Sequence, residues 1–227
     1  MDDVLNRGSP RRAFLAGVAA GGLLLLPGCA SVANFSTVEV IRRLLEHATR
    51  NAFARLTAPD GFWNSAVARI DMPVLFGKRA GLIKGILSSD AFREKLQKQL
   101  NNIAEDGARK AAPVVAEAVR TIGIANAVDL LKGGPTAATS FLRAEMGTGL
   151  VNAMIPELDK AMRIVRDPIL AQAIAALTGV NLGDAAHGLA LDADNAIWFE
   201  IGAAEAQIRA NPEATNDAVL IAGLKAL

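Results

Sequence analysis

Residues 35–56 read FSTVEVIRRLLEHATRNAFARL and contain the clearest structural signal of the chain. Ser36 and Glu39 have the S-x-x-E spacing of a helix capping box. Apolar residues then recur at intervals of three and four, which is the period of one helix face. This stripe consists of Val38, Ile41, Leu45, Ala48, Ala52 and Leu56. The stretch therefore predicts an amphipathic helix that ends before residue 60.

The same helical period continues along the rest of the chain, and no segment alternates with the period of a strand for long. We expect further helices over 74–87, from Ser89 or Asp90 with a kink or restart at Pro113, over 124–131, over 136–165 with a break near Pro156, from Asp167 to Gly179, from Asp194 to residue 210, and over 217–227. These patterns predict an all-α fold, a single irregular bundle of about six to eight helices.

Two segments lack this helical pattern. Residues 57–73 hold Phe62 and Trp63, which we expect to pack as a plug against the first helix rather than to bind a ligand. Residues 181–194 are rich in Gly and Asp and predict a loop. Gly81 and Gly85 form a G-x-x-x-G pattern that indicates close packing within the predicted helix over 74–87.

Composition supports one folded domain. The chain has 227 residues, of which 52% are hydrophobic, 4% aromatic and 21% charged. That length suffices for one well-buried core and is short for two. Since aromatic residues are scarce, the core must be aliphatic and rich in alanine.

Residues 1–28 resemble an export signal. Arg11 and Arg12, followed by Phe14 and Leu15, resemble a twin-arginine signal, and a general secretory signal is the alternative. The uncharged run over 13–26 reaches only about 21 Å as a helix, which is short for a hydrocarbon core of about 30 Å. The run is therefore interpreted as part of a signal peptide.

Leu26, Pro27 and Gly28 precede the one cysteine of the chain, Cys29, and together they resemble a lipobox. Lipidation of Cys29 divides the chain into a signal (1–28), an anchor with a short tether (29–36) and a helical domain (37–227). Cleavage after Ala33 is the alternative. Because Ala30 follows the cysteine, the resemblance to envelope sorting signals predicts a protein held by its lipid anchor at the outer membrane and facing the periplasm. The domain would then contain no thiol for a disulfide or a thiolate metal site.

Charge is distributed unevenly. Residues 29–110 contain 13 basic and 8 acidic residues, whereas residues 111–227 contain 8 basic and 13 acidic residues. Solvated helix faces that differ by chance are one explanation. Contact of the basic half with anionic lipid headgroups is the other. Nucleic acid is a poor partner for this near-neutral, exported chain.

Catalytic patterns are absent from the sequence. His47 lies inside the first predicted helix, and His187 lies near Asp184, Asp192 and Asp194, which form the one cluster with metal-ligand residue types. Ala196 and Ile197 stand where a calcium loop needs a ligand and a glycine, so we interpret the cluster as a solvated loop. Glu105 and Asp106 are adjacent and face different sides of a helix. We therefore predict no catalytic residue, no metal and no cofactor.

The mature chain resembles a family of exported, mostly proteobacterial helical proteins known only as a domain of unknown function, whose members often begin with a signal or lipoprotein peptide. The resemblance covers about Val38 to the C-terminus. It rests on Asp60-Gly61-Phe62, Ile70-Asp71-Met72-Pro73, residues 108–113, 127–133, 137–139 and 208–212 in this order. The chain departs from the family at Asn126, where Asp is usual, and has fewer aromatic residues near Trp198. The family has no established activity, so no catalytic residue follows from the resemblance.

Three functions remain open. The first is a non-enzymatic interaction or accessory module of the periplasm with an envelope protein as partner. The second is a carrier of an apolar ligand such as a lipid, suggested by Met146, Met154 and Met162, which could line a cavity. Ordinary core packing is the alternative for these methionines. The third is an enzyme with an unrecognised site.

Overall fold

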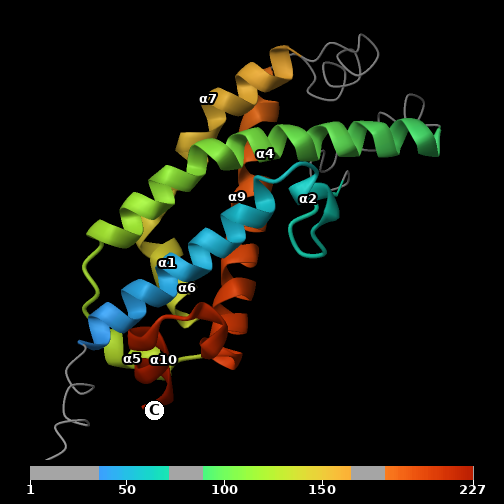
Figure 1. Cartoon of the computed structure of the whole chain (residues 1–227). Helices are drawn as coiled ribbons and strands as arrows, with labels where there is room; N and C mark the ends of the chain where they lie inside the picture. Colours follow the sequence, from blue (N-terminus) through green and yellow to red (C-terminus); the bar gives the residue numbers. More distant parts are fainter. Residues whose placement is uncertain (1–35, 72–88, 165–181, 227) are drawn as a thin grey trace, which may run out of the picture. The chain divides into compact units, whose positions relative to one another are not determined.

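The computed structural model describes residues 36–71, 89–164 and 182–226, and every regular element in these stretches is a helix (Figure 1). They contain eight α-helices and one 3₁₀ helix. This confirms the predicted all-α fold, with a helix number in the predicted range. The predictions for 74–87, with its Gly81 and Gly85, and for the helix beginning at Asp167 lie outside the described residues.

Helix α1 (Thr37–Leu56) has the predicted bounds. Ser36 is its N-cap, and its hydroxyl accepts a hydrogen bond of 3.1 Å from the backbone N–H of Glu39. At the same end of α1, the Arg42 guanidinium donates to the backbone carbonyls of Val119, Arg120 and Ile122. Val119 and Arg120 belong to the last turn of α4 and Ile122 is its C-cap, so α1 caps the C-terminal end of α4.

Helix α2 (Gly61–Asn64) follows a tight turn after α1. Phe62 is fully buried, so the predicted plug against the first helix is confirmed for this residue. Trp63 is only half-buried, and the Arg69 guanidinium lies 3.8 Å from its ring centroid. Beyond α2, the backbone of Ile70 is held by the buried side chain of Asn101.

Helix α4 (Asp90–Thr121) begins where the sequence predicts and continues through Pro113 without a restart. The helix bends along its length (Figure 1). Pro113 is exposed, where the loss of one backbone hydrogen bond is tolerated. Gly107 allows close packing with α7, since a Cβ at this position would lie 2.8 Å from Leu158 Cδ2.

Helices α6 (Ala137–Met146) and α7 (Gly149–Arg163) are separate. The predicted break near Pro156 is wrong, because α7 runs through this exposed proline. The chain breaks instead at Gly147, whose φ of 51° is a conformation that residues with a Cβ rarely adopt.

Helix α5 (Ala127–Lys132) is joined to α6 through the buried Glu205–Arg209 pair. The Glu205 carboxylate accepts backbone hydrogen bonds from Ala138 and Thr139 at 3.1 and 2.7 Å. Arg209 donates at 2.9 Å to the carbonyls of Leu130 and Leu131. One ion pair therefore caps the end of α5 and the beginning of α6.

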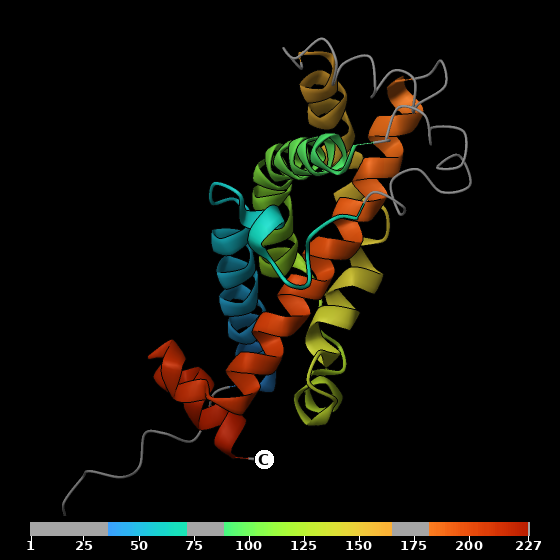
Figure 2. The ribbon, with the colours of Figure 1, turned by 90° about the vertical axis from the view of Figure 1, so that its right-hand side faces the viewer.

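Helix α9 (Leu182–Ala210) shows that the loop predicted over 181–194 is wrong. Its first half includes Gly188 and Asp192 and buries Ala186, Leu189, Ala190 and Ala193. α9 packs against both α1 and α7, and Figure 2 shows its long orange-red ribbon running past α1. Burial of this alanine-rich face compensates for the low helix propensity of Gly and Asp.

The chain then forms a 3₁₀ helix, η2 (Pro212–Thr215), and the short helix α10 (Ala218–Lys225). Asp217 is the N-cap of α10, and its Oδ2 accepts from Arg43 at 3.0 Å and lies 3.3 Å from His47 Nε2. Asp217 thus holds the C-terminal helix on α1.

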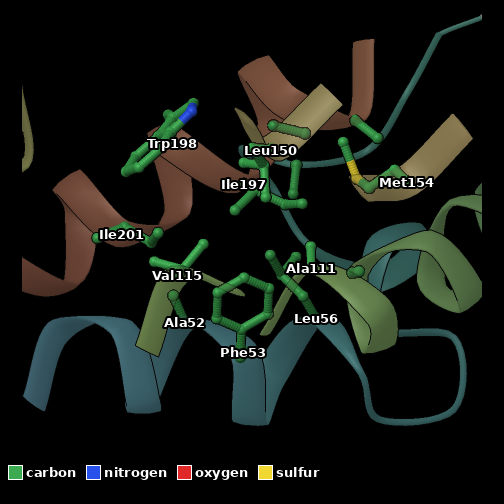
Figure 3. Packing of buried hydrophobic residues seen from close by; sticks show 14 of the residues in the cluster. Ala52, Phe53, Leu56, Ala111, Val115, Leu150, Met154, Ile197, Trp198 and Ile201 are labelled. Carbon is green, nitrogen blue, oxygen red and sulfur yellow. The ribbon is translucent and has the colours of Figure 1, made fainter. Parts of the chain in front are cut away.

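The core lies where α1, α4, α7 and α9 meet (Figure 3). Side chains shown there include Ala52, Phe53 and Leu56 of α1, Ala111 and Val115 of α4, Leu150 and Met154 of α7, and Ile197, Trp198 and Ile201 of α9. Met154 and Met162 are buried in this core and Met146 packs against it, as ordinary core packing predicts. Within the described residues, no helix has the length and hydropathy needed to cross a bilayer.

Candidate functional site

The turn from α1 to α2 has a geometry that only a few residues permit. Asp60 adopts a φ of 57°, and its carboxylate pairs with Lys98 at 3.2 Å. A Cβ at Gly61 would lie 2.3 Å from the carbonyl oxygen of Arg55 and 2.6 Å from that of Leu56. Glycine is therefore required at residue 61, and it allows α2 to lie directly against the end of α1.

Glu105, a buried residue of α4, lies next to this turn. Burial raises the pKa of Glu105, although the backbone N–H groups of Phe62 and Gly61 and the charge of Arg109 lower it in part. Arg109 lies 3.6 Å from Glu105 and donates at 3.2 Å to the carbonyl of Thr57. The carboxylate of Glu105 is thus buried beside the first turn of α2, and its Oε1 has no hydrogen-bond partner among the described residues.

A second buried carboxylate, Glu200 of α9, lies on the other side of the turn. Its Oε1 accepts a 2.5 Å hydrogen bond from Nε of Arg55, and its Oε2 accepts one of 3.1 Å from the Ser65 hydroxyl. Ser65 Oγ in turn accepts from the backbone N–H groups of Val67 and Ala68. Glu200 therefore fixes both the Arg55 guanidinium and the segment after α2.

These residues surround a concavity of about 490 Å³, which we name the corner pocket. It is lined by Arg55, Ala58, Pro59, Gly61, Asn64, Ser65, Ala66, Val67, Glu200, Ala203 and Gln207. The lining combines apolar side chains with the amides of Asn64 and Gln207 and with Arg55, which Glu200 holds. Arg55 and Glu200 are the charged side chains among these lining residues.

A second concavity of about 670 Å³, the α1–α4 groove, runs between the C-terminal halves of α1 and α4. Its lining is Glu46, Thr49, Arg50, Phe53, Ala54, Thr57, Ala112, Pro113, Ala116, Val119 and Arg120. Thr49 is buried, and its hydroxyl has no hydrogen-bond partner among the described residues. The groove is mainly apolar and its rim carries both signs of charge.

The predicted export and anchor residues lie outside the described residues. These are Arg11, Arg12, Phe14, Leu15, the lipobox residues Leu26, Pro27 and Gly28, and Cys29. Their roles stay predictions.

The structure separates the residues of the predicted histidine cluster. His187 and Asp184 are exposed on α9, whereas Asp194 is buried and accepts hydrogen bonds from Trp198 Nε1 at 2.9 Å and Arg143 at 3.0 Å. His47 lies on α1 beside Asp217. Within the described parts of the chain, no three His, Cys, Asp or Glu side chains are placed to hold a metal ion.

Sequence reasoning missed Arg55 and Glu200. Arg55 belongs to the polar side of α1, and Glu200 is separated from it by 145 positions. No spacing or motif links the two residues. Only the Asp60-Gly61-Phe62 stretch, used above for the family resemblance, pointed to this turn.

The comparisons with known proteins agree with that resemblance. A family described as "Protein of unknown function (DUF4197)" matches residues 31–222. No curated protein and no solved structure matches the chain. Since the match covers most of the sequence, the chain belongs to this family of proteins of unknown function.

Proposed function

We propose that this protein is an envelope lipoprotein whose helical domain is a non-enzymatic interaction or accessory module in the periplasm, with the corner pocket as its docking surface. The observation that carries the proposal is the arginine held by a buried carboxylate in the lining of this concavity. A preorganised donor of this kind favours binding, because little side-chain freedom is lost when a ligand arrives.

The sequence supports the envelope location. The signal-like segment ends in Leu-Pro-Gly-Cys, and the anchor would place the domain at the outer membrane, facing the periplasm. A lipoprotein cysteine carries two or more acyl chains, which suffices for stable anchoring. Growth of bacteria with radiolabelled palmitate should label the wild-type chain and leave the Cys29→Ser variant unlabelled. An unlabelled wild-type chain would contradict lipidation.

Docking at the corner pocket is tested in intact cells. A photoreactive amino acid at Ala58, which is exposed and lines the pocket, should give a defined covalent adduct with an envelope protein. The same residue at Ala144, exposed on α6, provides the matched control. Reproducible absence of an adduct at residue 58, or equal adducts at both positions, would refute this docking surface.

The α1–α4 groove favours a second candidate function, a carrier of an apolar ligand. Its volume lies in the usual range of small-ligand sites. Mass spectrometry of organic extracts should then find one non-covalent lipid in the purified Cys29→Ser chain. The replacement Ala116→Trp, which fills the groove, should remove that lipid. An extract without lipid would exclude the carrier function.

A further inference from the structure

We infer that the corner pocket binds the carboxyl-terminal end of a peptide chain, with the terminal carboxylate on Arg55. This inference rests on the proposed interaction function and specifies the chemistry of the partner at that site. It follows from the hydrogen bonds of Arg55, from the charges around it and from the walls of the pocket.

Arg55 has unused donors in a fixed orientation. Its Nε is held at 2.5 Å by Glu200, whose side chain is only 8% exposed. In the part of the chain that the structure describes, the two terminal nitrogens of Arg55 donate no hydrogen bond, and the side chain remains 43% exposed. A guanidinium held at one edge presents the other edge as a planar fork, which matches a carboxylate.

The acids around the turn do not compete with such a ligand. Both oxygens of Glu200 already accept hydrogen bonds, from Arg55 and from Ser65. Asp60 pairs with Lys98, and Glu105 is buried and does not line the pocket. Arg55 is therefore the charged group of the lining that is left with free hydrogen-bonding capacity, which favours an anion over a cation.

The groups that line the pocket around Arg55 are better suited to bind a peptide than a bare inorganic anion. The side-chain amides of Asn64 and Gln207 line the pocket, are exposed and form no hydrogen bond with the described residues. An amide both donates and accepts, as the peptide group does. Val67, which is 51% exposed, and Ala58 and Pro59 form an apolar wall for the last side chain.

The size of the pocket favours a short segment over a folded partner surface. A volume of about 490 Å³ is within the range of small-ligand pockets. A stable interface between folded proteins buries at least about 1,000 Å². A chain end that enters the pocket can bind with a few residues, because the carboxylate, the amides and the apolar wall act together.

The binding test uses the full chain with Cys29→Ser, so that no covalent acyl chain interferes. A library of peptides with free carboxyl ends is first selected for binding to this protein, and the selected peptides are compared for a common last residue. Calorimetry then compares the selected peptide, and acetyl-Ala-Ala-Val as a fixed probe, with the same peptides ending in a carboxamide. We expect the free acids to bind at least about tenfold more tightly than the amides. Isobutyrate alone, a small acid without peptide groups, should bind more weakly than either peptide.

The variants identify the site. Arg55→Lys keeps a cation beside buried Glu200, so the fold persists, but it removes the fork and should weaken the peptide about tenfold. Gln207→Ala should weaken it less. The matched control is Arg143→Lys, another half-exposed arginine that pairs with a buried acid of α9, which should leave binding unchanged.

Three results would overturn the inference. The first is that peptides ending in a carboxamide bind as tightly as those ending in a free carboxylate, and the second is that isobutyrate binds as tightly as the peptides. The third is that the selected peptides share no last residue and that acetyl-Ala-Ala-Val does not bind at about 5 mM. If an envelope partner still crosslinks at residue 58 in those cases, the proposed interaction function stands and only the carboxylate chemistry fails. If the peptides bind in solution and no partner crosslinks in cells, the envelope function fails and the site stands.

Discussion

Asn101 of α4 forms a pair of hydrogen bonds with the backbone of Ile70, which lies 31 positions earlier in the chain. Its Oδ1 accepts from Ile70 N–H at 2.9 Å, and its Nδ2 donates to the Ile70 carbonyl at 3.0 Å. Both residues are buried. The segment after α2 is non-helical at this point, so the asparagine side chain takes the place of a neighbouring strand.

Replacement of this asparagine should destabilise the fold. Asn101→Ala leaves the buried N–H of Ile70 without a partner, whereas the Ile70 carbonyl still accepts from Gln97 Nε2 at 3.1 Å. We expect a loss of about 1–3 kcal/mol in the free energy of unfolding. Urea denaturation followed by circular dichroism measures it. Asn152→Ala, which removes an exposed asparagine of α7, should change stability by less than about 0.5 kcal/mol. Equal effects of the two replacements would refute the role of Asn101.

Gly61 should be intolerant of a side chain for steric reasons. Gly61→Ala places a Cβ against two backbone carbonyls that cannot move independently of α1, and we expect a loss of more than about 2 kcal/mol. Gly188→Ala is the opposite case, because no neighbouring atom beyond the local helix backbone lies within 4 Å of its Cβ position in the first half of α9. There alanine should stabilise by about 0.5–1 kcal/mol. Thermal unfolding of the two variants should therefore shift in opposite directions.

The Glu205–Arg209 pair should be far more sensitive than an exposed pair of equal spacing. Arg209→Ala leaves a fully buried carboxylate without its cation, and we expect a loss of about 3–5 kcal/mol. The exposed pair Arg163–Asp159 also has i,i+4 spacing. Arg163→Ala should cost no more than about 0.5 kcal/mol in a parallel urea titration. Similar losses in both variants would mean that α5 and α6 do not depend on the buried pair.

Asp192 should make stability depend on pH. Burial raises the pKa of Asp192 to about 6 in the folded protein, from 3.8. The folded state therefore holds the proton more tightly, and stability is lost as the pH rises from about 4 through 6. Asp192→Asn should stabilise the protein at pH 7 by about 1 kcal/mol, a value reduced for the half-exposed side chain, and should have little effect near pH 4.

The control for this prediction is Asp184→Asn, which removes an exposed carboxylate of the same helix. This variant should not reproduce the gain of about 1 kcal/mol that Asp192→Asn gives at pH 7, because Asp184 lies in the first turn of α9, where a carboxylate is favourable. The difference in free energy of unfolding between Asp192→Asn and the wild type is compared at pH 4 and pH 7. An equal difference at both pH values would contradict a raised pKa of Asp192.

The local sequence was sufficient to predict the ends of those helices whose boundaries depend on neighbouring residues. α1 begins at Ser36 because a hydroxyl cap and an apolar period coincide there, and α9 stops at Asn211-Pro212 because proline cannot continue the ladder. Asp217 caps α10 for the same local reason. In these cases the decisive contacts span only a few positions.

Local signals failed where burial outweighed propensity. Gly188 and Asp192 predicted a loop, yet the alanine face of the same segment is buried, and the segment is helical. Pro156 predicted a break, yet it is exposed within α7, and the break is at Gly147. Propensity amounts to about 1 kcal/mol for a glycine, which the packing of one helix against another exceeds.

The candidate site depends on tertiary structure alone. Arg55 pairs with Glu200, and Arg43 pairs with Asp217, so cations of the basic half meet acids of the acidic half across the fold. The uneven charge along the sequence is thus partly compensated within the domain. The crossing of α1 and α9 brings Arg55 and Glu200 together, and helix crossings are set by the shapes of many buried side chains. The linear pattern of residues predicts the helices. The contact between two side chains 145 positions apart forms only when those helices pack against each other.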